Sequence, residues 1–189
     1  MSGTWRAFQS ALPYSSGSFS ISKVATLQAP NEAIFVEEVS PLSGPELAQL
    51  LPAAIQLWEQ RGLDEQSLQR LRETRVEVAG LPGPLLGATS QDVIRIDSTA
   101  AGFGWFIDAT PDRNEEFTLH NSVYRAPVGS DAGRMDLLTV LTHEMGHLLG
   151  FRDLDSDLHA DDIMSDTLSP GMRRLPWAKA VDRVFAEGF

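Results

Sequence analysis

The stretch "HEMGHLLGF", residues 143–151, decides how this chain is interpreted, because two of its histidines stand four positions apart. On a helix, residues i and i+4 lie one above the other, so His143 and His147 can bind one ion between them. Glu144 is turned about 100° around the helix from His143, which places its carboxylate beside such an ion without making it a ligand. The pattern H-E-x-x-H therefore predicts a metal site bordered by a carboxylate.

The stretch "DAGRMDLLTVLTHEMGHLLGF", which begins at residue 131, is predicted to form one long helix that carries the histidines and ends at Gly150. On a helical wheel over 134–149, His143 and His147 point to nearly the opposite side from the apolar residues, together with Asp136 and Val140. This separation argues against two core histidines and leaves a solvent-facing pair as the alternative without a function. The apolar arc, roughly 120° wide, consists of Leu137, Leu138, Leu141, Met145, Leu148 and Leu149.

Two further features sharpen the metal prediction. Gly146 stands inside the helix, where glycine costs about 1 kcal/mol relative to Ala, so we expect another part of the chain to pack closely against it. The pattern continues as H-E-x-x-H-x-x-G-x-x-D, and Gly150 can turn the backbone so that Asp153 points back toward the histidines. A catalytic zinc ion takes about three protein ligands and keeps one position open. His143, His147 and Asp153 meet that requirement.

This extended motif resembles that of the metzincin metallopeptidases, and within them the matrixin-like branch. These proteins place a methionine in a tight turn beneath the metal, and "DDIMSDTL" supplies Met164 at a fitting distance. Most of them use histidine as the third ligand, and Asp153 in its place is similar to the snapalysin-like group. The stretch "LLPAAIQLWEQ" resembles the backing helix of the family, with Trp58. The chain also resembles peptidase-like modules of large bacterial surface or secreted repeat proteins.

The resemblance covers roughly residues 33–180 and is strongest over 134–166. It implies an α+β fold of the zincin (metzincin) type, in which a mixed twisted sheet carries a backing helix and an active-site helix. Residues 1–30 are Ser-rich and weakly patterned, and we expect an N-terminal tail or a loosely docked segment. Residues 31–189 are expected to form the metallopeptidase domain, with a small C-terminal subdomain, 151–189, after the Gly turn.

The implied activity is that of a zinc-dependent endopeptidase. His143, His147 and Asp153 would hold one Zn²⁺ that activates a water molecule, and Glu144 would act as the general base. The substrate is expected to be a polypeptide that lies extended along the sheet edge. One alternative is a catalytically silent, zinc-stapled binding module of a larger surface protein, against which the intact Glu144 argues. A metal-dependent hydrolase of non-peptide amides is a second alternative, which the extended motif disfavours.

Other polar residues near the motif have weaker interpretations. His159, twelve residues after His147, competes with Asp153 as the third ligand, and we favour Asp153 because its distance from the Gly turn fits the motif. Asp166 occupies the position two residues after the methionine where some metzincins carry a tyrosine, so no such tyrosine is implied. His120 is expected to be structural or to line the rim of the cleft. The segment after the methionine is expected to form the S1′ pocket.

An acidic run follows the histidine helix and offers the oxygen ligands that Ca²⁺ prefers. EF-hand spacing is not present in it, and a solvated acidic loop is the favoured interpretation. Its members are Asp153, Asp155, Asp157, Asp161 and Asp162.

The composition excludes several classes of protein. A net charge of −11 argues against nucleic acid as a partner, and the absence of cysteine excludes disulfides, thiolate zinc sites and a cysteine-based latency switch. No apolar run approaches the roughly 20 residues that span a bilayer. No secretory signal is visible, although the resemblance implies a secreted or cell-surface protein, either a monomer or a module of a larger chain.

The remaining elements follow from helix caps and from apolar alternation. One helix is predicted after the N-cap Ser43 and before Gly62, and Pro52 inside it should kink or split it. This helix is predicted over about 45–61, and further helices over 64–73 and about 177–187. The predicted strands lie within 33–39, 74–83, 92–97, 102–108 and, more weakly, 117–124.

Overall fold

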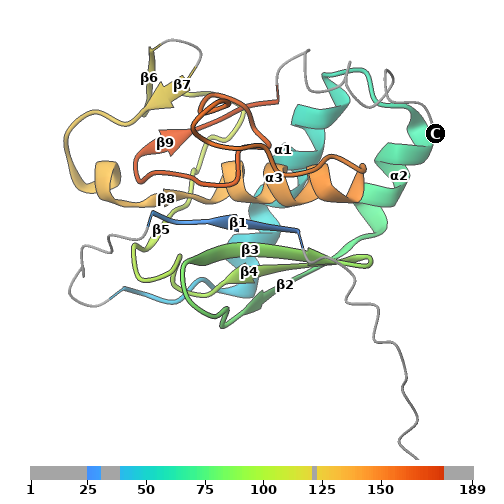
Figure 1. Cartoon of the computed structure of the whole chain (residues 1–189), viewed down its shortest axis with the longest axis horizontal. Coiled ribbons are helices and arrows are strands. Elements are labelled where there is room, and N and C mark those ends of the chain that lie inside the picture. The colour runs from blue at the N-terminus through green and yellow to red at the C-terminus, as the bar shows by residue number, and fades with distance from the viewer. Residues whose placement is uncertain (1–24, 31–38, 121–122, 177–189) are drawn as a thin grey trace, which may run out of the picture.

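A computed structural model describes residues 25–30, 39–120 and 123–176, which form a mixed α+β fold. Helices α1 (Gly44–Glu59) and α3 (Leu137–Leu148) pack against each other and against a four-stranded sheet. Helix α2 (Glu65–Glu73) contacts α1. Figure 1 shows α3 above the sheet, with α1 and α2 beside it.

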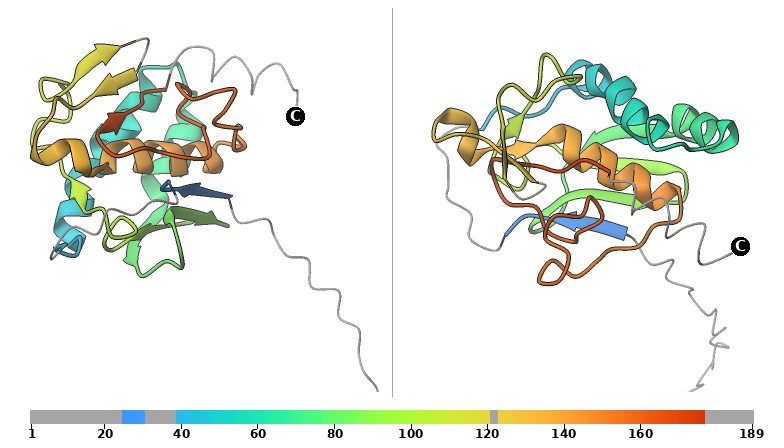
Figure 2. Two further views of the ribbon diagram at one scale, coloured as in Figure 1. Left: turned by 60° about the vertical axis from the view of Figure 1, so that its left-hand side comes forward. Right: turned by 90° about the horizontal axis from the view of Figure 1, so that it is seen from above.

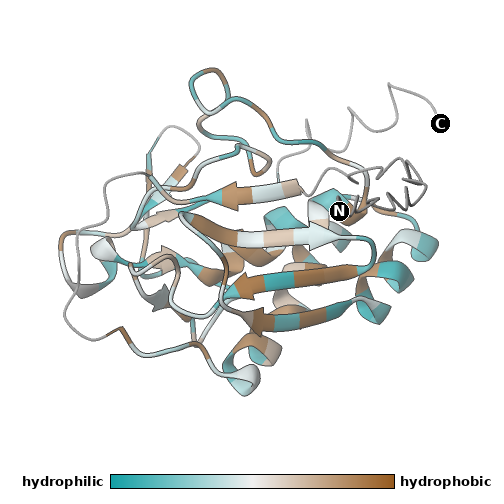
Figure 3. Cartoon of the chain, turned by 60° about the horizontal axis from the view of Figure 1, so that its bottom comes forward, coloured by the Kyte–Doolittle hydropathy of each residue, from teal (hydrophilic) through white to brown (hydrophobic). Residues whose placement is uncertain are grey.

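The sheet has the strand order β1-β3-β4-β2. Strands β2 and β4 run parallel, whereas β3 is antiparallel to both β4 and β1. The strand order places β1 at one edge of the sheet. Ile94 and Ile96 of β4 are fully buried and alternate with the half-buried Arg95, the alternation visible along the strands in Figure 3. The strand bounds are β1 (Ala25–Gln28), β2 (Arg75–Ala79), β3 (Leu85–Ser90) and β4 (Val93–Asp97).

Short strands between and after these elements form two smaller sheets. Strand β5 pairs with β8 in parallel, and β7 pairs with both β6 and β9 in an antiparallel sense. A 3-10 turn, η1 (Ser130–Gly133), precedes β8. The strand bounds are β5 (Trp105–Phe106), β6 (Thr118–His120), β7 (Val123–Arg125), β8 (Met135–Asp136) and β9 (Met172–Arg173).

Helix α1 begins as the sequence predicts, because Ser43 and Glu46 form a reciprocal capping box. Pro52 does not split it, and α1 runs as one helix to Glu59. Pro52 and Ala48 are both exposed, so water can hydrogen bond to the carbonyl that proline leaves without a partner. The buried face of Leu47, Leu50, Ala54 and Trp58 holds both halves of the helix on the core.

Helix α3 is shorter and more deeply buried than predicted. Its N-cap is Asp136, which accepts a hydrogen bond from the Thr139 amide, and the residues before it form η1 and β8 instead of further helical turns. The helix ends close to Gly150, which has a left-handed φ of 93°. Every residue from Leu137 to Gly146 is buried, so the expected polar face is wrong. The sheet, α1 and the segment after Gly150 together surround the helix (Figure 2).

The other sequence predictions have mixed outcomes. Helix α2 and strands β2 and β4 lie where predicted. Strand β3 was not predicted, and the stretch 117–124 contributes to two paired strands instead of one. The predicted final helix, 177–187, and most of the predicted strand 33–39 lie outside the described residues. Within the described part of the chain, no helix has the length and apolar character needed to cross a membrane.

Residues 25–30 differ from the expectation of a tail or a loosely docked segment. Ala25–Gln28 form the edge strand β1, and Leu27 and Ala29 belong to the hydrophobic core, with 0% and 3% of their surface exposed. This segment lies directly beside the end of α3 and the loop that follows it (Figure 2).

Candidate metal centre

The two imidazoles and the carboxylate of Asp153 converge on one point. The Nε2 atoms of His143 and His147 lie 2.9 Å apart, and Asp153 Oδ1 lies 3.4 Å from the first and 3.1 Å from the second. Two ligand atoms about 2.0–2.1 Å from a tetrahedral zinc ion are about 3.3 Å apart. The three atoms are therefore spaced as the ligands of one small metal ion would be.

Hydrogen bonds to backbone carbonyls determine which imidazole nitrogens are free. His143 Nδ1 lies 2.8 Å from the Ile163 carbonyl oxygen, and His147 Nδ1 lies 3.0 Å from that of Phe151. A carbonyl oxygen can only accept, so each Nδ1 carries the proton and each neutral ring presents an Nε2 lone pair. Two lone pairs and a carboxylate oxygen thus face one another, an arrangement that a cation stabilises. Carbonyl partners on Nδ1 also fix the ring orientation of metal-binding histidines.

The two carboxylates near the imidazoles differ in what they already bind. Glu144 Oε1 accepts a hydrogen bond from the Leu27 amide at 3.2 Å, and Oε2 accepts one from Thr89 Oγ1 at 2.7 Å. Asp153 Oδ1 is buried and has no hydrogen-bond partner of good geometry, although it lies within 3.4 Å of both imidazole nitrogens. Buried polar atoms without partners are uncommon in native proteins. Asp153 is therefore the better candidate ligand, and Glu144 is the neighbouring carboxylate.

The pKa values of these groups are shifted in opposite directions. Burial raises the pKa of the Glu144 carboxyl, and the neighbouring imidazoles and hydrogen bonds only partly offset this effect. Burial acts in the same sense on Asp153, but the two imidazoles outweigh it and hold the pKa of that carboxyl well below its usual range. Burial acts to lower the pKa of His147, but Asp153 and Glu144 outweigh it and raise that pKa. Glu144 is thus the carboxylate that accepts a proton more readily.

The helix is fixed in place by contacts with the segment that contains Met164. A Cβ atom on Gly146 would overlap Met164 Sδ and lie 3.2 Å from Trp58 Cζ2, which confirms the expected close packing at this glycine. Ile163, next to Met164, supplies the carbonyl that orients His143. From α1, Trp58 Nε1 donates a hydrogen bond to the Thr142 carbonyl at 3.0 Å. These contacts hold the imidazoles on a rigid helix.

The other residues singled out in the sequence lie away from this cluster. Within the described ranges, a group of metal-binding side chains with all ligand atoms within 4.8 Å of one another is found only around His143 and His147, where it includes Glu144. His159 and the other members of the acidic run, Asp155, Asp157, Asp161 and Asp162, therefore belong to no such group among the described residues. His120 is exposed on β6, and the strand beside Glu144 is β3.

Two residues that contact Glu144 were not found from the sequence. Thr89 and Leu27 lie 55 and 117 positions from it, so no local spacing connects them. Gly87 did carry a signal, because glycine inside a strand often marks a close approach. A Cβ atom there would lie 2.6 Å from Glu144 Oε1, so only glycine leaves room for this carboxylate.

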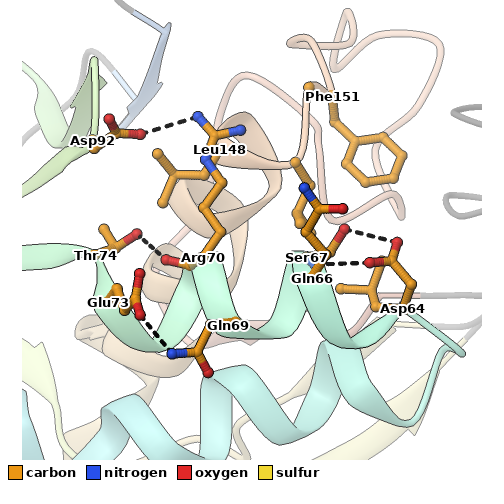
Figure 4. A pocket seen from close by; sticks show the side chains of 13 residues that line it. Asp64, Gln66, Ser67, Gln69, Arg70, Glu73, Thr74, Asp92, Leu148 and Phe151 are labelled. Carbon is orange, nitrogen blue, oxygen red and sulfur yellow. Dashed lines mark hydrogen bonds and ion pairs between the residues drawn. The ribbon is translucent and has the colours of Figure 1, made fainter. Parts of the chain in front are cut away.

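A surface pocket between α2 and the end of α3 does not include the cluster. It is lined by residues of α2 and by Leu148, Gly150 and Phe151. Figure 4 shows several of its polar side chains paired with one another, for example Arg70 with Asp92, which are 3.0 Å apart. We assign the candidate site to the imidazole cluster, because the groups that can bind a metal ion lie there and do not line this pocket.

Comparisons of the chain with models of protein families, with characterised proteins and with solved structures found no match.

Proposed function

We propose that this protein is a zinc-dependent endopeptidase. The observation that carries the proposal is the convergence of His143 Nε2, His147 Nε2 and Asp153 Oδ1, with Glu144 beside them. Two imidazoles and one carboxylate are a donor set suited to zinc, and three protein ligands leave a position open. A bound zinc ion would supply Lewis acidity, which polarises a peptide carbonyl and makes water a nucleophile near neutral pH.

Each residue of the site has a separate task in this proposal. His143, His147 and Asp153 hold the ion, and the carbonyls of Ile163 and Phe151 keep the two rings oriented. Glu144 accepts a proton from water and returns it to the leaving amine. Its raised pKa supports this role, because a carboxylate in a dry site takes up a proton more readily than an exposed one.

The arrangement of the elements supports a metzincin-like fold as part of the same proposal. Helix α1 with Trp58 lies behind the histidine helix, and Met164 packs beneath it against Gly146. Strand β3 and the segment after Met164 flank the cluster, where an extended polypeptide substrate can pair through its main chain. A secreted or cell-surface location and the bacterial repeat-protein context rest on the sequence resemblance alone.

A zinc-stapled module without catalysis is the second candidate. It is favoured by Glu144 itself, which is fully buried and whose two oxygens both accept hydrogen bonds from the protein. In such a module the metal would stabilise the fold, and no peptide would be cleaved.

The deciding experiment combines metal analysis with a cleavage assay on the purified full chain. We expect one bound zinc ion per chain and cleavage of an unfolded protein that a chelator stops. Glu144→Gln should retain zinc and lose activity by about 10²–10⁴-fold, the range for removing a general base. Glu59→Gln, an exposed glutamate at the end of α1, is the matched control and should cleave normally. Equal cleavage by Glu144→Gln would refute the assigned role.

A further inference from the structure

We propose that residues 25–30 are a built-in occupant of the peptide-binding groove, and that they hold the metal centre closed in the full chain. This inference rests on the proposed function, because it interprets the space beside Glu144 as the place of a substrate. It also explains why a carboxylate placed to act on a peptide is already hydrogen bonded to one.

The segment is paired through its main chain on both sides. On one side β1 runs antiparallel to β3, with Thr26 opposite Ala88 and Leu27 opposite Gly87. On the other side the Gln28 amide donates to the Asp166 carbonyl at 3.0 Å, and the Leu168 amide donates to the Gln28 carbonyl at 2.9 Å. The chain thus lies as an extended peptide between β3 and the loop that follows Met164 (Figure 2).

The segment also contacts the residue that would carry out proton transfer. The Leu27 amide donates to Glu144 Oε1, so the peptide bond between Thr26 and Leu27 lies beside this carboxylate. The Leu27 side chain is 0% exposed, whereas the Gln28 side chain is exposed. Any other peptide that entered the groove would have to displace β1 and take over its hydrogen bonds.

Strand β1 makes fewer contacts in total than the two central strands, although its pairing with β3 is as extensive as that of β3 with β4. It is four residues long and lies at the edge of the sheet, and its register is irregular between Leu27 and Gln28. Ala25 and Thr26 are only half-buried. A short edge strand of this kind can leave while the β3–β4–β2 core remains folded. As part of the same chain, it competes with an added peptide at an effective concentration on the order of millimolar.

The test uses two substitutions at Gln28 in the full chain. Gln28→Pro removes the amide that donates to Asp166, and Gln28→Ala keeps it, while both alter an exposed side chain. Both are made in a Glu144→Gln background, whose side-chain oxygen still accepts a hydrogen bond. The probe is a fluorescently labelled synthetic peptide of residues 25–30, ATLQAP, and its anisotropy reports binding.

We expect Gln28→Pro to bind the probe at least about tenfold more tightly than Gln28→Ala, because the tethered competitor is weakened. Amide hydrogen exchange should then show faster exchange in β1 with unchanged protection in β4 and α3. Leu27→Asp, which removes the buried side chain, should strengthen probe binding further. Equal binding by all variants, or no binding by any, would overturn the proposal. Global unfolding of Gln28→Pro would overturn it as well, because β1 would then be an integral strand.

Cleavage measured with Glu144 intact separates this proposal from the proposed function. We expect Gln28→Pro to cleave a quenched fluorescent peptide about tenfold faster than Gln28→Ala in the presence of zinc. If the variant binds the probe and zinc but cleaves nothing, the occupied groove stands and the endopeptidase fails. If wild type and variant cleave at the same rate, the endopeptidase stands and the built-in occupant fails.

Discussion

Helix α3 carries a buried polar cluster near each end, and the two differ in whether their hydrogen bonds are complete. Near its N-terminus the guanidinium of Arg173 lies between Asp136 and Asp108, and all three side chains are at most 1% exposed. In its C-terminal half lie His143 and His147, with Asp153 facing them. The two imidazole side chains, at 0% and 3% exposed, are almost as buried as Arg173, so burial alone does not distinguish a structural cluster from a site.

The Arg173 cluster already contains its own cation. Arg173 Nη2 donates to Asp136 Oδ1 at 2.8 Å, and Nη1 lies 2.7 Å from Asp108 Oδ2, while the guanidinium also packs 4.3 Å from the centre of the Phe117 ring. Asp108 Oδ2 lacks a hydrogen bond of good angle, but we give the ion pair more weight because a permanent charge lies at contact distance. Asp136 in addition caps α3. This cluster is complete without a ligand.

The histidine cluster contains no permanent cation. The proton of each imidazole is used on a backbone carbonyl, which leaves three acceptors facing one another. A buried cluster with its donors and acceptors matched stabilises the fold, whereas a cluster of acceptors alone is suited to a bound cation. Substitutions in the two clusters test this distinction.

The first prediction concerns Arg173→Met. Removing the guanidinium leaves two buried carboxylates without their cation, which typically costs about 3–5 kcal/mol in the free energy of unfolding. For a chain of this size, the melting temperature should fall by on the order of 10 °C, as measured by circular dichroism or calorimetry.

Arg70→Met is the matched control, because Arg70 also forms an ion pair, with Asp92, but both side chains are more than half exposed. Exposed pairs contribute about 0–1 kcal/mol, so this variant should melt near the wild-type temperature. A similar fall in melting temperature for both variants would mean that the buried Arg173 cluster stabilises the fold no more than an exposed ion pair does. The proposed difference between the two ends of α3 would then be wrong.

The second prediction concerns zinc itself. Zinc at about 100 times its dissociation constant should stabilise the wild-type chain by about 3 kcal/mol and raise its melting temperature by on the order of 5–10 °C. His147→Ala should lose this rise, because one of the three converging ligands is gone. His159→Ala should keep it. Loss of the rise in His159→Ala would instead make His159 a ligand and would contradict the assignment of Asp153.

The parts of this site that could be predicted from the sequence are those encoded locally. His143, Glu144, His147 and Asp153 lie within eleven consecutive positions of a helix and its turn, so spacing alone indicates which atoms can meet. The burial of α3 and the contacts of Glu144 come from segments far away in the sequence, and no periodicity within the helix encodes them.

The fold follows the same division. Helices α1 and α2 were predictable because Ser43 and Asp64 cap them locally. Strand β3 was missed because Gly87 and Ala88 are weak strand formers. At Gly87 a glycine is favoured by the space that Glu144 needs. The N-terminus of α3 was placed too early because Arg173, 37 positions away, holds Asp136 at the cap.

The smallest loss of stability is expected from a substitution at Gly146. At this residue the histidine cluster is fixed by packing, because its hydrogen bonds are incomplete. In Gly146→Ala the new methyl group overlaps Met164 and approaches Trp58, a strain of about 1–3 kcal/mol that the better helix propensity of alanine offsets by about 1 kcal/mol. We expect a net loss of up to about 2 kcal/mol in the free energy of unfolding, measured by denaturant unfolding. Gly44→Ala, with open space around its Cβ position, should cost nothing comparable.

Adding Met164→Ala to Gly146→Ala should relieve part of the loss, because the two residues are in contact and their effects should not be additive. Strict additivity would place the strain elsewhere, and the turn beneath α3 would no longer explain how the cluster is held.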